Sequence, residues 1–582
     1  MEIRRKLTGA GGFSRGLRRG ERGVVLIAAL AAVIVVGALA AALFTTARAE
    51  MNQARTLRVR SELLPLAEAA TVSAEQRLLQ ELANSLPLTE KDEVAIGPHV
   101  VGWALAEVGA EETKTDDVGI QTLHQRYQID AVADVGGFRR TVHRLVDVGL
   151  TPIFQFAIFY GDDLELLPGP SMTLSGRVHA NGDIYVGSGA TLTIDSDYFR
   201  CTGDIWRKRK ESGAASTGTV RIRIADTTDF ASLYSESQLT GLGVPSTSGF
   251  DSAFLGYDAN GDGDLSDAGD WPDFVVGVLD SFQGSVQTGA HGMKPIVPPA
   301  IGSIQRFESV GSGVGDYAWD AGLGDYAYVG AGNGDHRKGR YHKNANLVIR
   351  DLTAYDAAGT PLALPAGTIT EQQMWDAREG QAVKVTQVDI ALLNSSGFLP
   401  ANGLLYASRS DASAANCAGV RLKNGSELAQ ALTVVSEDPV YVWGNYNSVD
   451  KKPAAVIADA LNLLSKSWND TKVSGSLPVA SATTYNFAMI AGADSTVGAA
   501  YSGGFENLPR FHENWSGIAC NFAGSFVKIF QSLIANGGWQ YGGDRYTAPD
   551  RNYQYDTMFQ NVTDLPPFTP NAAQVRSVGW WE

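Results

Sequence analysis

The feature that most constrains this chain is an uninterrupted apolar run near its N-terminus, from Val24 to Phe44. The run reads VVLIAALAAVIVVGALAAALF and contains no charged residue. As an α-helix it would be about 31 Å long, which is enough to cross the hydrocarbon core of a membrane. The apolar region of a secretory signal peptide is shorter, at about 7–15 residues. The run therefore predicts a membrane-spanning helix.

Charge is distributed unevenly on the two sides of this run. Residues 1–23 contain seven Lys and Arg residues and two Glu residues, a net charge of +5. The whole chain has a net charge of −16, so the remainder carries −21. The positive-inside rule places the basic head in the cytoplasm and the body outside the inner membrane, in the periplasm. The acidic body is not expected to bind nucleic acid.

The helix is predicted to continue beyond the membrane, over residues 24–86 in all. Residues 45–84 are rich in Ala, Leu, Glu, Gln and Arg, which favour helices. Pro65 is expected to kink the helix. The apolar positions that fall roughly on one face are Leu57, Leu64, Ala67, Val72, Leu79 and Leu82. The rear half should therefore be amphipathic.

An antiparallel sheet is predicted over residues 87–170. Ile129, Ala131 and Ala133 alternate with polar residues, which is the period of a β-strand. Gly136 and Gly137 supply a tight turn before the chain returns. The apolar run at 150–160 should be one buried strand.

The rest of the body has the pattern of a β-solenoid. Gly-Asp-Ile-Tyr at 182–185 recurs 21 residues later as Gly-Asp-Ile-Trp at 203–206, a period typical of solenoid coils. We expect a solenoid over 171–207 and 400–535, an insertion at 208–399, a tail at 536–582, and a helix over 453–468. A β-sandwich of unrelated hairpins is the alternative. The predicted fold class is α+β and β-rich.

The N-terminal segment resembles a known family. Arg-Gly-Glu-Arg-Gly at 19–23, followed by Val-Val-Leu-Ile-Ala-Ala-Leu, resembles a type III prepilin leader. The resemblance implies that a prepilin peptidase cuts between Gly23 and Val24, so that residues 1–23 are a leader. The run from Arg19 to Leu82 resembles the N-terminal domain of PilX-type minor pilins. It also resembles the K-type minor pseudopilin of type II secretion.

One position departs from the common pilin pattern. Most pilins carry a glutamate at the fifth mature position, where it neutralises a neighbouring N-terminal amine. After a cut at Gly23 that position is Ala28. The resemblance then implies a rare terminal subunit rather than a repeating one, as in K-type pseudopilins. The alternative is an uncut signal anchor.

The most specific motif in the body is an acidic loop, YDANGDGDLSDAGDWPD at 257–273. Its oxygen-bearing residues follow the spacing of a calcium-binding EF-hand loop, and Gly263 stands where the loop must turn. Position 12 is Gly269 instead of glutamate, so a later aspartate must complete the shell. The predicted ligands are Asp258, Asn260, Asp262, Asp264 and either Asp267 or Asp270. A solvated acidic turn is the alternative.

Catalytic motifs are weak. Glu506, His512 and Glu513 could form an acid–base set, but their spacing matches no zinc-protease helix. A polar loop packed by aromatic side chains explains them equally well. The chain has no nucleophile elbow, Walker loop or dinucleotide fingerprint, and its three cysteines are far apart. We therefore predict a protein that is not an enzyme.

These observations favour a structural role. The predicted function is a membrane-anchored minor pilin-like protein that joins or primes a type IV pilus or related filament at its tip. Its expected partners are other pilins or pseudopilins, the inner membrane and the prepilin peptidase, and the cell surface is its location once assembled. The alternatives are a type II secretion pseudopilin and a membrane-tethered solenoid enzyme that acts on polysaccharide.

Overall fold

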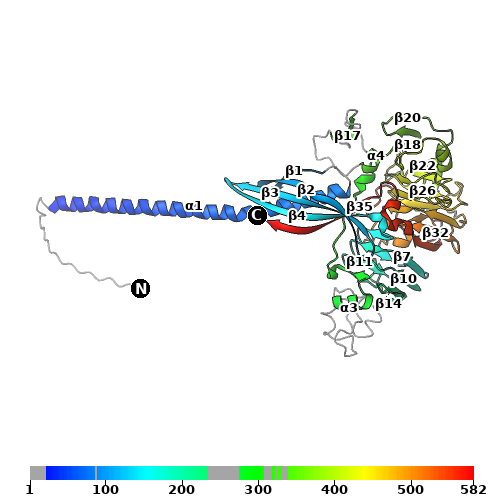
Figure 1. Ribbon diagram of the computed structural model, residues 1–582, viewed down its shortest axis with the longest axis horizontal. Helices are drawn as coiled ribbons and strands as arrows, with labels where there is room; N and C mark the ends of the chain where they lie inside the picture. The colour runs from blue at the N-terminus through cyan, green and yellow to red at the C-terminus, as the bar shows by residue number, and fades with distance from the viewer. Residues whose placement is uncertain are drawn as a thin grey trace, which may run out of the picture.

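The computed structural model describes residues 21–84, 88–216, 218–233, 274–306, 317–320, 325–328 and 339–582. A long helix, α1 (Glu21–Ala83), extends from a five-stranded antiparallel sheet, and a large β-solenoid lies at the far end of that sheet (Figure 1). This arrangement confirms the predicted α+β, β-rich fold class.

The five-stranded sheet is built from both ends of the body. Its order is β1-β2-β3-β4-β35, with every neighbouring pair antiparallel. Gly136 and Gly137 make the β3–β4 turn with φ of +60° and +81°, as the sequence predicts. The strands are β1 (Lys91–Ile96), β2 (His99–Thr115), β3 (Gln121–Val135), β4 (Phe138–Pro152) and β35 (Asn571–Trp581). Because β35 pairs with β4, residues 153–570 are inserted between two adjacent strands, and the expected C-terminal tail is in part a strand of this sheet.

The rear half of α1 packs on one face of this sheet. Small residues at the contact allow the helix to approach the sheet closely. The buried helix residues are Leu63, Leu66, Ala67, Ala70, Ala74 and Leu78. The predicted face was wrong at Leu57 and Val72, which are 59% and 44% exposed. Leu63, Ala67, Ala70 and Ala74 follow the 3.6-residue period more closely, and α1 is continuous through Pro65.

The solenoid has three sides, and one side is a single sheet of twelve strands. Its first ten strands are mutually parallel, and the last two form an antiparallel cap. In spatial order they are β15 (Val286–Gln287), β11 (Phe199–Cys201), β8 (Val178–Ala180), β5 (Ile158–Tyr160), β33 (Phe526–Lys528), β30 (Ala488–Ala491), β27 (Ala454–Ala458), β25 (Leu432–Val435), β23 (Leu404–Ser408), β18 (Leu347–Arg350), β19 (Thr353–Asp356) and β20 (Pro361–Leu362).

Each of the other two sides is divided into two shorter sheets. The second side contains β12 (Ile205–Trp206), β9 (Ile184–Val186), β6 (Leu164–Leu166), β31 (Arg510–Phe511), β28 (Leu461–Leu464), β26 (Val440–Trp443), β24 (Gly419–Lys423), β22 (Gln381–Asp389) and β21 (Ile369–Asp376). The third contains β14 (Phe230–Leu233), β13 (Thr219–Arg223), β10 (Thr191–Asp195), β7 (Met172–Ser175), β34 (Asp550–Tyr555), β32 (Ala519–Gly524) and β29 (Thr483–Asn486). A separate hairpin joins β16 (Tyr317–Asp320) to β17 (Asp325–Tyr328).

Short helices occupy the connections and the ends of the solenoid. Among the described residues, the short α-helices are α3 (Phe274–Phe282), α4 (Arg340–Asn344) and α5 (Ile390–Ser395). The 3₁₀ turns are η1 (Ile153–Gln155), η3 (Gly289–His291), η4 (Ile301–Ile304), η5 (Phe505–Asn507), η6 (Thr557–Gln560) and η7 (Val562–Asp564).

The chain enters the solenoid in the middle of its stack. From β5 it winds through β8 and β11 to β15 at one end, and it then crosses to β18 near the other end. From there it winds back until β33 pairs in parallel with β5, with Phe526 opposite Ile158. The Phe526 amide donates to the Ala157 carbonyl at 2.8 Å, and the Gly161 amide donates to the Lys528 carbonyl at 2.7 Å. Two runs of coils thus form one continuous stack.

Several predicted boundaries differ from the structure. The segment 208–399 contributes β13, β18 and β22 to the solenoid instead of being wholly an insertion. The helix predicted over 453–468 was wrong, because that segment forms strands β27 and β28. All five residues of β27 are buried. A short apolar run that is buried on all sides has no periodicity that distinguishes a strand from a helix. The run at 150–160 is broken by η1 after Pro152.

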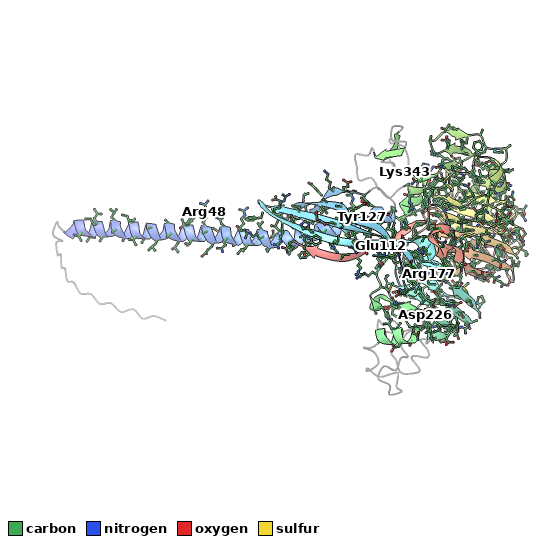
Figure 2. The ribbon with its side chains drawn as sticks, viewed as in Figure 1. Arg48, Glu112, Tyr127, Arg177, Asp226 and Lys343 are labelled. Carbon is green, nitrogen blue, oxygen red and sulfur yellow. The ribbon has the colours of Figure 1, made fainter. Side chains whose placement is uncertain are left out.

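Arg177 fixes the solenoid to the sheet, and Figure 2 shows it where the two meet. Its guanidinium donates to the Val118 carbonyl at 2.6 Å and 3.1 Å and to the Gln155 carbonyl at 3.1 Å. Val118 lies in the β2–β3 connection and Gln155 in η1. These contacts satisfy backbone acceptors where the sheet meets the solenoid.

We predict that Gly524→Ala destabilises the solenoid by about 1–3 kcal/mol, because an added methyl group forces the backbone to shift. Gly524 ends β32, and a Cβ there would lie 1.9 Å from the Phe487 carbonyl oxygen. Gly538→Ala is the matched control, because a Cβ at Gly538 meets no atom within 4 Å. Thermal unfolding followed by circular dichroism measures both variants. Equal melting temperatures for the two would contradict the close packing described for this coil.

Candidate functional site: the exposed N-terminal helix

The front half of α1 exposes its apolar side chains over its whole length. Val24, Ile34 and Phe44 are 67%, 62% and 75% exposed, and no part of the sheet or solenoid covers this half (Figure 1). Leaving one such side chain in water costs about 1.5–3 kcal/mol relative to burying it. The cost over the whole run requires an apolar partner, either lipid or other helices.

The length of the helix fits a membrane span. The one candidate span among the described residues covers Gly23–Ala83, and its most apolar window has a mean hydropathy of 3.0. The first charged residue after the apolar run is Arg48, which Figure 2 shows on the projecting part of α1. The structure thus supports a single-pass anchor near the N-terminus.

Gly23 and Val24 lie in the first turns of α1. The predicted leader up to residue 20 lies outside the described residues. A Cβ added at Gly23 would meet no atom within 4 Å. A substitution at Gly23 therefore leaves the packing of the body unchanged, so it can report on cleavage alone.

The rear half of α1 is fixed to the sheet by ion pairs as well as by apolar contacts. Arg144 of β4 contacts Glu75 of the helix at 2.8 Å. Burial is the largest influence on Glu75 and raises its pKa, while Arg144 opposes that shift. Arg77 bridges Glu81 of the helix and Asp92 of β1. These contacts fix the direction in which the front half leaves the body.

The predicted calcium ligands lie outside the described residues. Asp258, Asn260, Asp262, Asp264, Asp267 and Asp270 belong to the segment between Leu233, where β14 ends, and Phe274, where α3 begins. Both flanking elements lie at the same end of the solenoid (Figure 1). In the part of the chain that the structure describes, no group of three or more His, Cys, Asp or Glu side chains could hold a metal ion.

Glu506, His512 and Glu513 are buried separately, each with its own partners. Glu506 accepts the Leu167 amide at 2.6 Å, and Glu513 accepts the Ser465 amide at 2.7 Å. None of the three is more than 3% exposed. This arrangement favours the packed-loop interpretation over a catalytic set that a substrate could reach. The aromatic residues expected to pack the loop, Phe505, Phe511 and Trp515, are buried.

A buried charged network around His512 was missed by the sequence reasoning. The His512 ring approaches Asp376 at 3.8 Å, and the Tyr441 hydroxyl donates to Asp376 at 2.8 Å. Glu379 and Arg510 form an ion pair at 2.6 Å nearby. Burial lowers the pKa of His512 to about 4, so the ring is neutral at pH 7. Asp376 and Glu379 lie more than 130 residues from their partners His512 and Arg510, and no local motif links them.

We predict that Glu506→Gln stabilises the protein at pH 7–8 and flattens its stability profile above pH 4.5. Burial raises the pKa of Glu506 to about 7, despite the opposing charge of Arg551. The folded state therefore holds a proton that the unfolded state has lost, and stability falls as pH rises from 4.5 through 7. The full effect is up to about 3 kcal/mol.

Denaturant unfolding of wild type and variant at several pH values measures this effect. The amide oxygen of Gln can still accept the Leu167 amide, so the hydrogen bond is retained. Parallel pH profiles for the two proteins would show that Glu506 does not hold an extra proton in the folded state.

The chain was compared with protein families, curated proteins and solved structures. No protein-family model matches this sequence, and no curated protein matches it. Among solved structures, the chain is similar to the competence-associated pilin ComZ from Thermus thermophilus, at 8% identity over 90% of this chain and 97% of that chain. The TM-score is 0.23, which does not establish a common fold. The function proposed below is therefore argued from the helix, sheet and solenoid of this chain alone.

Proposed function

We propose that this chain is a membrane-anchored minor pilin-like structural protein that joins or primes a type IV pilus or a related filament at its tip. One observation carries the proposal: the front half of α1 is apolar and exposed, while the rear half is packed against an antiparallel sheet. Such a helix can rest in the inner membrane and then pack against the helices of other pilins or pseudopilins. Prepilin peptidase is the expected processing enzyme.

The position of the solenoid supports a terminal place in the filament. It lies at the end of the sheet opposite to the exposed half of α1 (Figure 1). A further subunit stacked along the direction of α1 would need the volume that the solenoid occupies. Ala28 also lacks the carboxylate that would neutralise a buried N-terminal amine of a neighbour. The K-type minor pseudopilin of type II secretion has the same departure and is the second candidate.

We predict that cleavage between Gly23 and Val24 produces the mature protein in cells with an active prepilin peptidase. Gly23→Val should leave residues 1–23 attached, because the residue before the cut is changed. Mass spectrometry of protein extracted from membranes distinguishes the cleaved protein from the uncleaved one by mass. Its control is wild-type protein from cells that lack the peptidase. An intact leader on the wild type in peptidase-positive cells would refute the pilin proposal.

We predict that immunogold labelling of the solenoid marks the ends of filaments. The body is too large to be repeated at every helical position, so only a terminal subunit avoids overlap with its neighbours. Labelling of a major subunit along the shaft provides the control. Gold distributed evenly along the shaft would exclude a terminal role.

We also propose that the acidic loop at 257–273 binds one calcium ion. The six aspartate carboxylates of this short segment repel one another unless a cation lies among them. Excess calcium should raise the free energy of unfolding by roughly 1–3 kcal/mol. Calorimetry of the full-length protein with calcium and with a chelator measures this, and Asp262→Ala should abolish the difference. A melting temperature that does not respond to calcium would identify the loop as an acidic turn.

A further inference from the structure

A cavity of about 360 Å³ lies where three successive coils of the solenoid turn a corner. Lys423 of β24 pairs with Trp443 of β26, and Trp443 pairs with Leu464 of β28. Its volume is in the range of small-molecule sites. The cavity is lined by Lys423, Asn424, Ser426, Trp443, Gly444, Asn445 and Lys466.

Trp443 forms a fixed aromatic platform in this cavity. The guanidinium carbon of Arg421 lies 4.8 Å from the centre of its ring. Arg421 is fully buried and is itself held by Asp470 at 2.6 Å and 2.9 Å and by Gln387 at 2.7 Å and 3.1 Å. The indole is therefore supported by an immobile cation. A ring that is already ordered loses little entropy when a ligand stacks on it.

The cavity carries one uncompensated positive charge. Of the residues that line it, only Lys423 and Lys466 are charged. Lys423 lies 3.6 Å from the Asp389 carboxylate, which largely balances it. Lys466 is exposed and forms no ion pair with any described residue. A single carboxylate matches this charge, whereas a polyanion would be repelled by a chain with a net charge of −16.

The remaining polar groups supply both hydrogen-bond donors and acceptors. The Asn445 side-chain oxygen accepts the Thr484 amide at 3.0 Å, which leaves its amide nitrogen able to donate. The Asn424 amide nitrogen donates to Asp389 at 2.7 Å, which leaves its oxygen able to accept. Ser426 adds a hydroxyl group. A mixture of donors and acceptors beside an aromatic face suits a ring that carries several hydroxyl groups.

We propose that this cavity binds an acidic saccharide, with a pyranose ring stacked on Trp443 and its single carboxylate on Lys466. Asn424, Asn445 and Ser426 bind the sugar hydroxyls. The site lies on the solenoid and does not depend on assembly of the chain into a filament.

The test is isothermal titration calorimetry of the full-length protein in detergent micelles with three probes. Cellobiuronic acid and cellobiose differ by one carboxylate, and tripolyphosphate is an anion without a sugar ring. We expect cellobiuronic acid to bind with a dissociation constant at or below about 10 mM, and cellobiose to bind about ten-fold more weakly. Lys466→Gln should remove that ten-fold difference and leave cellobiose binding unchanged. Lys114→Gln, which changes an exposed lysine on β2 that does not line the cavity, should change neither.

A second variant tests the platform. Trp443→Phe should weaken both sugars several-fold, because a smaller aromatic face remains, while the melting temperature reports whether the fold is retained. Absence of binding by both sugars, or a cellobiuronic acid affinity that Lys466→Gln leaves unchanged, would overturn the proposal. Tripolyphosphate binding as tight as that of cellobiuronic acid would also overturn it, because the site would then recognise charge alone.

Discussion

The pairing of β33 with β5 is the constraint on which the rest of the structure depends. These strands lie more than 360 residues apart in the chain, and their pairing joins the two runs of coils into one stack. The same closure brings β35 back to β4, since both strands flank the inserted solenoid. Closing so long a loop has an entropic cost that grows only slowly with length, so the stacked core can offset it.

The apolar core of the solenoid stabilises the pairing of β33 with β5. Equivalent positions on successive coils form a column of buried apolar side chains that crosses the junction without a break. Val456, Met489, Phe526, Ile158 and Val178 stand opposite one another on neighbouring strands, and each is at most 3% exposed. The junction is thus packed like any other pair of coils, and the two runs of coils share one apolar core.

Short sequence patterns predicted those parts of the molecule whose contacts are made between residues close together in the chain. The charge-free run of α1, the Gly136-Gly137 turn and the Gly-Asp-Ile repeat each determine structure within one element or one coil. The repeat also explains a contact: Asp183 accepts the amide of Asp204 at 2.8 Å, one coil later. The order of the coils, the return of β35 and the entry of the chain in the middle of the stack depend on pairings between distant segments, and a single sequence carries no local signal for those.

The candidate sites also divide into those that the sequence alone predicts and those that depend on contacts between distant segments. The exposed helix could be recognised from composition, because its partner is a bulk apolar phase and any sufficiently long apolar run will serve. The burial of Glu506 and His512 could not be recognised, because their partners Leu167 and Asp376 come from other coils. Trp443 and Lys466 are likewise brought together only by the stacking of β26 and β28.

The insertion of the solenoid between β4 and β35 has a mechanical consequence for the terminal role that we propose. Its two connections to the sheet leave from β4 and β35, which are adjacent and antiparallel. A pull on the body is therefore shared by two strands that are hydrogen-bonded to each other, and it reaches α1 through the whole sheet. The ion pairs of α1 with β1 and β4 then carry the load to the helix. A domain appended at one terminus would transmit the same load through a single connection, so insertion gives a body exposed at a filament end the stronger attachment.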